Sequence, residues 1–153
     1  MPGLYFEEFE EGRIFEHELR RTITEADNMS FSLMTMNPQP LHIDRHFAEG
    51  TQWGGPLVNS LLTLGLVIGL SVQDTTLGTT IGNLGMTNTR FPAPVLQGDT
   101  VSAKTTVVSV RESKSKQDRG VVEFKHEGFN QRGELVCECT RQAMMMKRPV
   151  DTA

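Results

Sequence analysis

The chain has few cysteines, and none of them suggests a disulfide or a metal site. Cys137 and Cys139 are the only two among 153 residues. Spaced two apart in a predicted strand, they share one face and make a poor disulfide. Two thiols with no nearby histidine also fall short of a metal site. We therefore expect reduced, structural cysteines, no metal, and a cytoplasmic protein.

The chain also lacks an excess of positive charge. Fifteen Lys and Arg residues face 19 Asp and Glu residues, for a net charge of −4, and no basic run is longer than a few residues. Nucleic-acid binding relies on a clustered basic face, so we expect no nucleic-acid partner. The N-terminal stretch MPGLYFEEFEEG has no apolar core and does not resemble a signal peptide.

A third absence is that of charge between residues 50 and 73. Polar residues and glycines interrupt this stretch, and its strongly apolar part is shorter than a bilayer requires. A helix that is apolar nearly all round can instead be buried in a globular fold. We therefore predict a buried helix that begins near residues 57–59 and ends by 71–74, and no membrane partner.

Neither repeats nor linkers interrupt the sequence, which predicts one domain over 1–153, with a lead-in at 1–12 and a tail at 148–153. Thr24 can cap a helix that has a partly apolar face at Met29, Leu33 and Met34. Two prolines in MTMNPQPLHID end that helix, and a helical turn is expected at 47–49. Strands are predicted at 13–22, 79–90, 99–111, 119–131 and 134–147.

This order of elements predicts an α+β fold. A curved antiparallel sheet wrapped around one apolar helix accounts for both the strand-rich C-terminal half and the helix. Pairing with a second copy would cover the helix and the sheet edge that remain open, so we expect a homodimer or a higher homo-oligomer.

The residue best suited to acid–base chemistry is His42. It lies in a proline-rich turn beside Asp44, and an imidazole titrates close enough to neutrality to take up and return a proton. A purely structural alternative is a loop histidine bonded to the backbone. The remaining histidines, His17, His46 and His126, are expected at the surface.

Four segments together resemble the signature of the MaoC-type acyl-CoA hydratases: NPQPLHID, Phe47-Ala48, GGPLVNSLLTLGL and FPAPVLQGDTV. The resemblance covers most of residues 24–111. It implies a single hot-dog domain that reversibly adds water to an enoyl-CoA thioester, with CoA as part of the substrate and no separate cofactor. It places His42 on the family's catalytic histidine, Asn37 on its catalytic aspartate, and Gln39 and Pro40 on the following motif positions.

Asn37 is a departure from the family pattern, because an amide cannot act as a base. His42 would then transfer protons nearly alone, with Asn37 orienting the water. Losing a negative charge beside the reacting carbons would also favour a substrate with its own carboxylate. We hypothesise a branched dicarboxylic acyl-CoA of the methylmalyl/mesaconyl or citramalyl/itaconyl type. The segments NLGMTNTRF and RESKSKQDRG resemble the MaoC branch that acts on such substrates.

The resemblance also assigns residues around the start of the apolar helix. The backbone N–H of Ser60, where the family usually has glycine, would stabilise the thioester oxyanion. Asn59 replaces the usual histidine and, with Gly55, would contact the substrate. Arg90 could pair with a substrate carboxylate. The plainer alternative is that Asn59 and Ser60 only cap the helix.

Two other functions use the same expected fold. A hot-dog thioesterase would hydrolyse the thioester, but such enzymes commonly place Asp or Glu on or facing the central helix, and the sequence has no carboxylate between Glu49 and Asp74. A non-catalytic acyl-CoA-binding protein is the other alternative, because Asn37 replaces the family's carboxylate.

Overall fold

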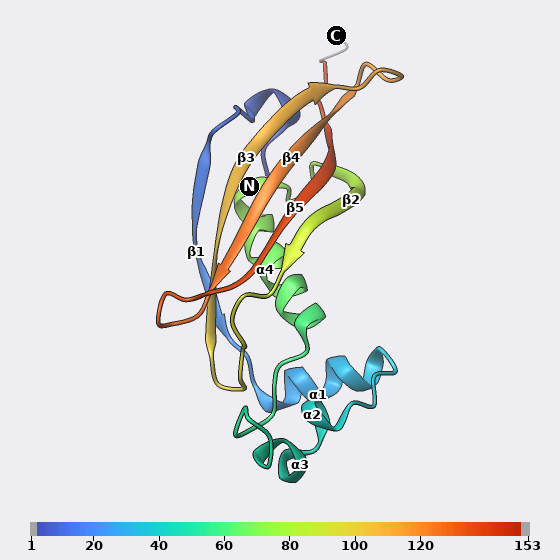
Figure 1. Cartoon of the computed structure of the whole chain (residues 1–153). Helices are drawn as coiled ribbons and strands as arrows, with labels where there is room; N and C mark the ends of the chain where they lie inside the picture. Colours follow the sequence, from blue (N-terminus) through green and yellow to red (C-terminus); the bar gives the residue numbers. More distant parts are fainter. Residues whose placement is uncertain (1–2, 151–153) are drawn as a thin grey trace.

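A single curved sheet surrounds one long helix in the computed structural model, which describes residues 3–150. Five antiparallel strands are ordered β1-β3-β4-β5-β2, and α4 lies in the hollow of the sheet (Figure 1). Along the chain the elements are η1 Phe6–Glu8, β1 Ile14–Thr22, α1 Glu25–Met34, α2 Pro40–Ile43, α3 Arg45–Glu49, α4 Ser60–Thr75, β2 Thr80–Arg90, β3 Thr100–Glu112, β4 Arg119–Phe129 and β5 Leu135–Met146.

The predicted α+β architecture is confirmed, and every predicted strand end lies within two residues of the observed one. The proline-rich segment is more ordered than expected, because Pro40 begins the short helix α2 instead of only ending the previous one. A proline at a first helical position loses no hydrogen bond. Residues 1–2 of the predicted lead-in and 151–153 of the predicted tail lie outside the described residues.

Helix α1 begins and ends with recognisable caps. The Thr24 hydroxyl accepts from the backbone N–H of Asp27 at 3.2 Å, and the Asp27 carboxylate accepts from the Thr24 N–H at 2.8 Å, a reciprocal capping box. At the other end Met36 has φ 59, a left-handed conformation that usually takes glycine. Its N–H bonds the Leu33 carbonyl, and the Asn37 N–H bonds the Ser32 carbonyl at 2.8 Å. This Schellman motif turns the chain into Asn37.

The interior contains two apolar clusters. The first joins the start and middle of α4 to the lower half of the sheet and includes Val67, Val101 and Ala103. A second, built around Phe124 and Met145, is covered by the N-terminal segment that carries η1. Helix and sheet approach closely at Gly128, where even a methyl group would overlap the Val67 side chain.

A chain of hydrogen-bonded side chains separates the two clusters. On β3, Ala103 belongs to the first cluster and Val107 to the second, and Thr105 lies between them. We call this chain the cross-sheet relay; it takes one residue from α4 and one from every strand, in the order Asp74, His17, Thr105, His126, Arg141 and Asn83. The successive donor–acceptor distances are 2.8, 2.8, 2.9, 3.0 and 2.7 Å.

The relay corrects the prediction for two histidines. His17 is 7% exposed and His126 is fully buried, so both were wrongly expected at the surface; His46 is exposed as predicted. Burial, helped by the positive charge of Arg141, lowers the pKa of His126 to about 3. The cysteines are free and buried, and burial raises the pKa of Cys137 to about 12, which suits a structural thiol and not a nucleophile.

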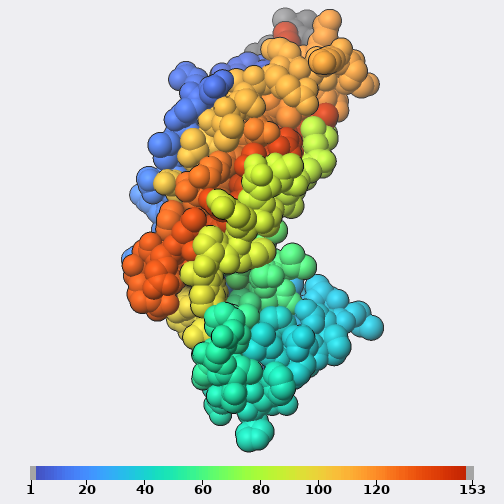
Figure 2. Space-filling model, in the orientation of Figure 1, coloured from blue at the N-terminus to red at the C-terminus, as the bar shows by residue number. Residues whose placement is uncertain are grey.

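One side of the molecule is left uncovered. Leu61 on α4 is 59% exposed and Leu84 on β2 is 53% exposed, so α4 is not buried all round as predicted. Strand β2 forms the sheet edge, with β5 as its one neighbour. Beyond the end of the sheet, residues 24–59 project as a separate lobe (Figure 2). No helix among the described residues is long and apolar enough to cross a membrane.

Candidate active site

His42 is held in a fixed orientation by the chain segment that leads into α4. Its Nδ1 atom lies 2.7 Å from the backbone carbonyl oxygen of Leu57. A carbonyl oxygen only accepts, so Nδ1 carries the hydrogen. In the neutral ring the lone pair is then on Nε2, which has no hydrogen-bond partner within residues 3–150. His42 therefore presents one free basic nitrogen.

The segment around His42 is organised by a residue that sequence reasoning did not select. Asn28 on α1 is fully buried, and its amide nitrogen donates to the carbonyl oxygens of Leu57 at 3.0 Å and His42 at 3.3 Å. Its oxygen accepts from the Asn59 N–H at 2.9 Å. One side chain thus connects α1, α2 and the start of α4. We call this the Asn28 network.

This network also corrects the predicted orientation of α1. The buried face of α1 consists of Asn28 and Ser32, whereas Leu33 and Met34 are exposed. The Asn59 amide donates to the Ser32 hydroxyl at 3.3 Å. A signal for this face was available, because Asn28 and Ser32 are spaced by four residues and so lie on one side of a helix.

Asn37 presents its amide hydrogens. The side-chain oxygen accepts from the Gln39 N–H at 3.1 Å, which leaves the NH₂ group without a partner among the described residues. The role of Asn37 stays a prediction: its NH₂ group can donate to a water oxygen or to a substrate carboxylate, and its oxygen has a second lone pair that can also accept.

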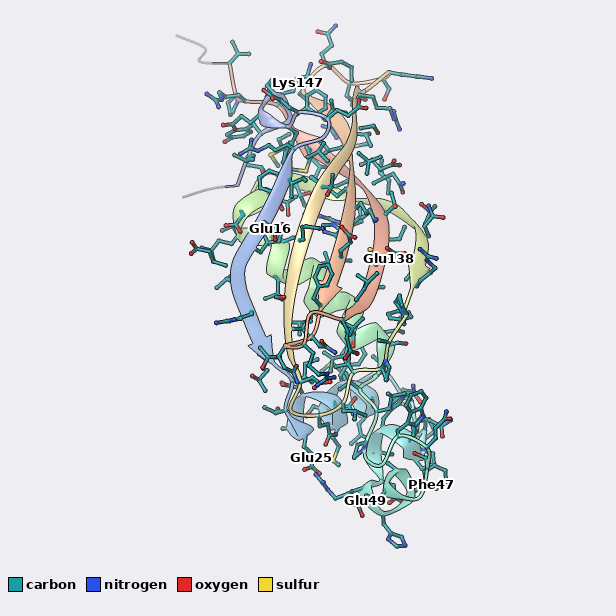
Figure 3. The ribbon with its side chains drawn as sticks, turned by 60° about the vertical axis from the view of Figure 1, so that its left-hand side comes forward. Glu16, Glu25, Phe47, Glu49, Glu138 and Lys147 are labelled. Carbon is teal, nitrogen blue, oxygen red and sulfur yellow. The ribbon has the colours of Figure 1, made fainter. Side chains whose placement is uncertain are left out.

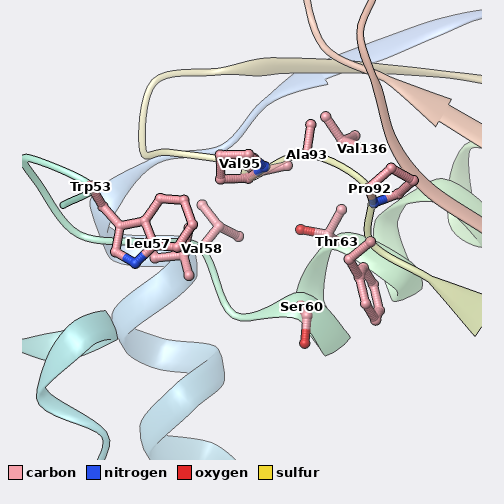
Figure 4. A pocket seen from close by; sticks show the side chains of 11 residues that line it. Trp53, Leu57, Val58, Ser60, Thr63, Pro92, Ala93, Val95 and Val136 are labelled. Atoms are coloured by element: carbon pink, nitrogen blue, oxygen red, sulfur yellow. The ribbon is translucent and has the colours of Figure 1, made fainter.

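A cavity of about 210 Å³ lies at the start of α4. Figure 4 shows Val58 and Val95 on one side of it and α4 on the other. The lining is mostly apolar and carries no charged side chain; it consists of Trp53, Leu57, Val58, Ser60, Thr63, Phe91, Pro92, Ala93, Pro94, Val95 and Val136. Leu57, whose carbonyl oxygen holds His42, is part of this wall. His42 and Asn37 are not among the residues that line this cavity.

The first turn of α4 supplies hydrogen-bond donors to this cavity. Asn59 is buried and caps the helix, because its side-chain oxygen accepts from the Leu61 N–H at 3.1 Å. The Ser60 N–H has no partner in the described part of the chain. In Figure 4 the Ser60 hydroxyl points away from the cavity, so only its backbone can serve there. A free N–H at the positive end of a 16-residue helix favours negative charge.

The two other predicted substrate contacts lie outside this cavity. Gly55 lines a separate hollow with Arg45 and Gln97, on the other side of the short bridge between Leu57 and Leu96. The Arg90 guanidinium pairs with the buried carboxylate of Glu138. Figure 3 shows Glu138 on the sheet, far from Phe47 and Glu49 on the projecting lobe.

No three His, Cys, Asp or Glu side chains within residues 3–150 are grouped as metal ligands. The site therefore consists of one oriented imidazole, one amide donor, a helix N-terminus and an apolar cavity. Such a set can transfer a proton and stabilise an oxyanion on an apolar ligand.

Comparison with known proteins defines the class of the fold. The chain superposes on a Mycobacterium tuberculosis protein described as having a double hot-dog fold, with a TM-score of 0.85 over 99% of this chain and 46% of the other, at 24% identity. A MaoC-like dehydratase from Rhodospirillum rubrum superposes with a TM-score of 0.82 over 97% and 100% of the two chains, at 29% identity. The fold is a hot-dog fold.

Sequence similarity is more specific. The family described as MaoC like domain matches residues 8–128. A β-methylmalyl-CoA dehydratase of Chloroflexus aurantiacus is 35% identical over 96% of this chain and 41% of its own length. A mesaconyl-CoA hydratase of Cereibacter sphaeroides is 32% identical over 99% and 43%. The chain thus belongs to the MaoC-like domain family, and it spans less than half the length of these two relatives.

Proposed function

We propose that this domain is a hydro-lyase that reversibly adds water to the double bond of an enoyl-CoA thioester. The observation that carries the proposal is the 2.7 Å contact between His42 Nδ1 and the Leu57 carbonyl. It leaves Nε2 as a free base and ties the ring to a residue of the cavity wall. The names of relatives in the same family agree with this activity.

The proposed step uses His42 twice. In the hydration direction, Nε2 takes a proton from water while the water oxygen bonds to the β-carbon. The electrons of the double bond move toward the thioester oxygen and give an enolate. The imidazolium then returns its proton to the α-carbon, so the ring ends as it began. The Ser60 N–H, at the positive end of α4, would stabilise the enolate oxygen. The step needs no cofactor beyond the CoA carried by the substrate.

We further propose a dicarboxylic acyl group. Asn37 stands where the family has aspartate, and its free NH₂ group can donate to a carboxylate that an aspartate would repel. The relatives named for β-methylmalyl-CoA and mesaconyl-CoA support the same substrate class. Arg90 is less well suited to this role than expected, since its charge is paired with Glu138.

We propose a second copy of this chain as a protein partner. Strand β2 has one free edge, and all its residues except Gly82 are exposed. Exposed Leu61 and Leu84 would be covered by a second β2 and α4. A cytoplasmic location fits the CoA chemistry and the two free thiols. Size measurement in solution at several concentrations tests the oligomer.

The activity is tested with crotonyl-CoA, mesaconyl-CoA and itaconyl-CoA, by following loss of the enoyl thioester absorbance. Activity on at least one of them is expected, and His42→Ala should lower kcat by about 100-fold or more, as removal of a general base does. His46→Ala is the matched control, because His46 is exposed and lies four residues away on α3.

Two results would contradict the proposal. Release of free CoA thiol without hydration would indicate a thioesterase. Unchanged hydration in His42→Ala would remove His42 from the reaction. Clear preference for crotonyl-CoA over both dicarboxylic thioesters would leave the hydratase proposal intact and exclude the dicarboxylic one.

A further inference from the structure

Thr63 is the one residue whose side-chain hydroxyl is directed into the cavity at the start of α4. It lies one helical turn after Ser60, and the residue as a whole is 2% exposed. In Figure 4 its hydroxyl points toward the space in front of Val58, whereas the Ser60 hydroxyl points away. Around it the lining is almost entirely aliphatic, aromatic or proline. A single hydroxyl in an apolar wall is suited to orienting a ligand.

The Thr63 hydroxyl makes no hydrogen bond within residues 3–150. Two other hydroxyls on α4 bond backbone carbonyls: Thr75 bonds the Ser71 carbonyl and Ser71 bonds the Ile68 carbonyl. In α4 the Asn59 carbonyl, which Thr63 could use in the same way, accepts only the Thr63 N–H. The Thr63 oxygen is not one of the fully buried, unpaired polar atoms of the described residues, so its partner comes from the cavity, as a water or a ligand.

The position of Thr63 selects the part of the substrate that it can reach. An α-helix rises about 1.5 Å per residue, so Thr63, three residues after Ser60, lies about 4.5 Å along the axis from the Ser60 N–H that would hold the thioester oxygen. In a dicarboxylic acyl group with a four-carbon main chain, the two carbons of the double bond separate the thioester carbonyl from the distal carboxylate. This separation is comparable with the rise between Ser60 and Thr63. A methyl group at the same place, as in crotonyl-CoA, could not accept a hydrogen bond.

We propose that Thr63 is a substrate-positioning residue that donates its hydroxyl hydrogen to the distal carboxylate of a dicarboxylic acyl-CoA with a four-carbon main chain, such as mesaconyl-CoA. This inference rests on the proposed hydratase function and specifies its substrate class. It explains how a cavity without a charged side chain can select an acyl group that carries one free carboxylate: a neutral donor, the Thr63 hydroxyl, binds that carboxylate. Hydrogen bonds from neutral donors to a carboxylate are among the stronger ones in proteins.

The test is the substrate preference of two variants that differ by one group. Thr63→Val keeps the shape and removes the hydroxyl, and Thr63→Ser keeps the hydroxyl. With mesaconyl-CoA as the probe, Thr63→Val should lower kcat/KM by about 10- to 100-fold, mainly through KM, while kcat/KM for crotonyl-CoA changes by less than about threefold. Thr63→Ser should recover most of the loss.

Thr75→Val is the matched control, since Thr75 is buried on the same helix but its hydroxyl is bonded to Ser71. It should leave the ratio of the two substrates unchanged. An equal loss on both substrates in Thr63→Val, or no loss on either, would overturn the role of Thr63 while leaving the hydratase intact. A wild-type protein that prefers crotonyl-CoA would overturn this inference and leave the hydratase intact. A wild-type protein that hydrates neither thioester would overturn the hydratase proposal as well.

Discussion

Two buried polar networks in this small protein are built in opposite ways. The Asn28 network uses one side chain to bind three backbone groups from two short segments, at residue 42 and at residues 57–59. The cross-sheet relay uses side chains only, one from each strand, joined end to end. The first fixes a loop that has little regular structure of its own. The second lies in a sheet whose strands are already joined by backbone ladders, so it adds little to the shape of the fold and places polar side chains in its core.

The comparison shows where each network is vulnerable. Removing the centre of the Asn28 network releases several backbone groups at once, because all of them depend on the same amide. Removing one member of the relay disconnects a chain whose remaining members keep their strands. We therefore expect substitutions in the two networks to change stability in different ways. The predictions follow from the largest expected effect to the smallest.

The largest effect is expected from Asn28→Leu. It leaves the His42 carbonyl oxygen and the Asn59 N–H without this partner, at about 1–3 kcal/mol each, while the Leu57 carbonyl keeps its contact with His42 Nδ1. The free energy of unfolding should therefore fall by about 3 kcal/mol in urea denaturation. Because the His42 segment loses its anchor, kcat should fall by about tenfold or more. Ser30→Ala on the exposed side of α1 should change stability by less than about 0.5 kcal/mol. A stable and active Asn28→Leu would show that the loop is held by other contacts.

The relay should make stability depend on pH in acid. His126 has a pKa of about 3 in the folded protein and an ordinary value of 6.5 when unfolded, so the unfolded state binds more protons between these values. Its contribution is complete above pH 6.5 and is lost as pH falls toward 3, by about 1.4 kcal/mol per pH unit. Between pH 7.5 and 5.0, wild type should lose about 2 kcal/mol more than His126→Gln.

His46→Gln provides the control for this pH experiment, because it removes an exposed histidine and should follow the wild-type curve. Chemical denaturation at a series of pH values measures all three proteins. If wild type and His126→Gln lose stability in parallel, His126 is protonated without penalty and the relay is not a closed chain.

The smallest effect is expected at Met36, at the end of the helix α1 that carries Asn28. Met36 has a positive φ at the end of α1, which costs a non-glycine residue about 1–2 kcal/mol, partly offset by the flexibility that glycine adds to the unfolded chain. Met36→Gly should therefore raise the unfolding free energy by about 0.5 kcal/mol. Met34→Gly, two residues earlier and inside the helix, should lower it by about 1 kcal/mol.

The same two networks show what the sequence could predict. Proline, glycine and capping signals gave the strands and helices closely, since these depend on local geometry. The position of His42 followed from its motif, but the role of Asn28 did not, because its partners are carbonyl groups 14 and 29 residues away. Its spacing from Ser32 on the helix was the one local signal.

The relay was hidden for a related reason. His17 and His126 have charged neighbours in sequence and were expected at the surface, although both are buried in the fold. Alternation along β4 was the better guide, because Phe124, His126 and Gly128 point to the same side, toward the core. Partners separated by 57, 88 and 21 residues come together only when the strand order is known, and the strand order is not a local property.

Arg141 on β5 determines the direction of the hydrogen bonds along the relay as far as His17 on β1, the opposite edge of the sheet. A guanidinium donates hydrogen bonds and cannot accept them. Arg141 Nε lies 3.0 Å from Nε2 of His126, so Nε2 is the acceptor and the hydrogen of the neutral His126 ring is on Nδ1. The Thr105 hydroxyl accepts that Nδ1 hydrogen and donates its own hydrogen to Nε2 of His17. The hydrogen of His17 is then on Nδ1, which donates to the Asp74 carboxylate. A single arginine on β5 thereby dictates the tautomers of two imidazoles, and every hydrogen between them and α4 points the same way.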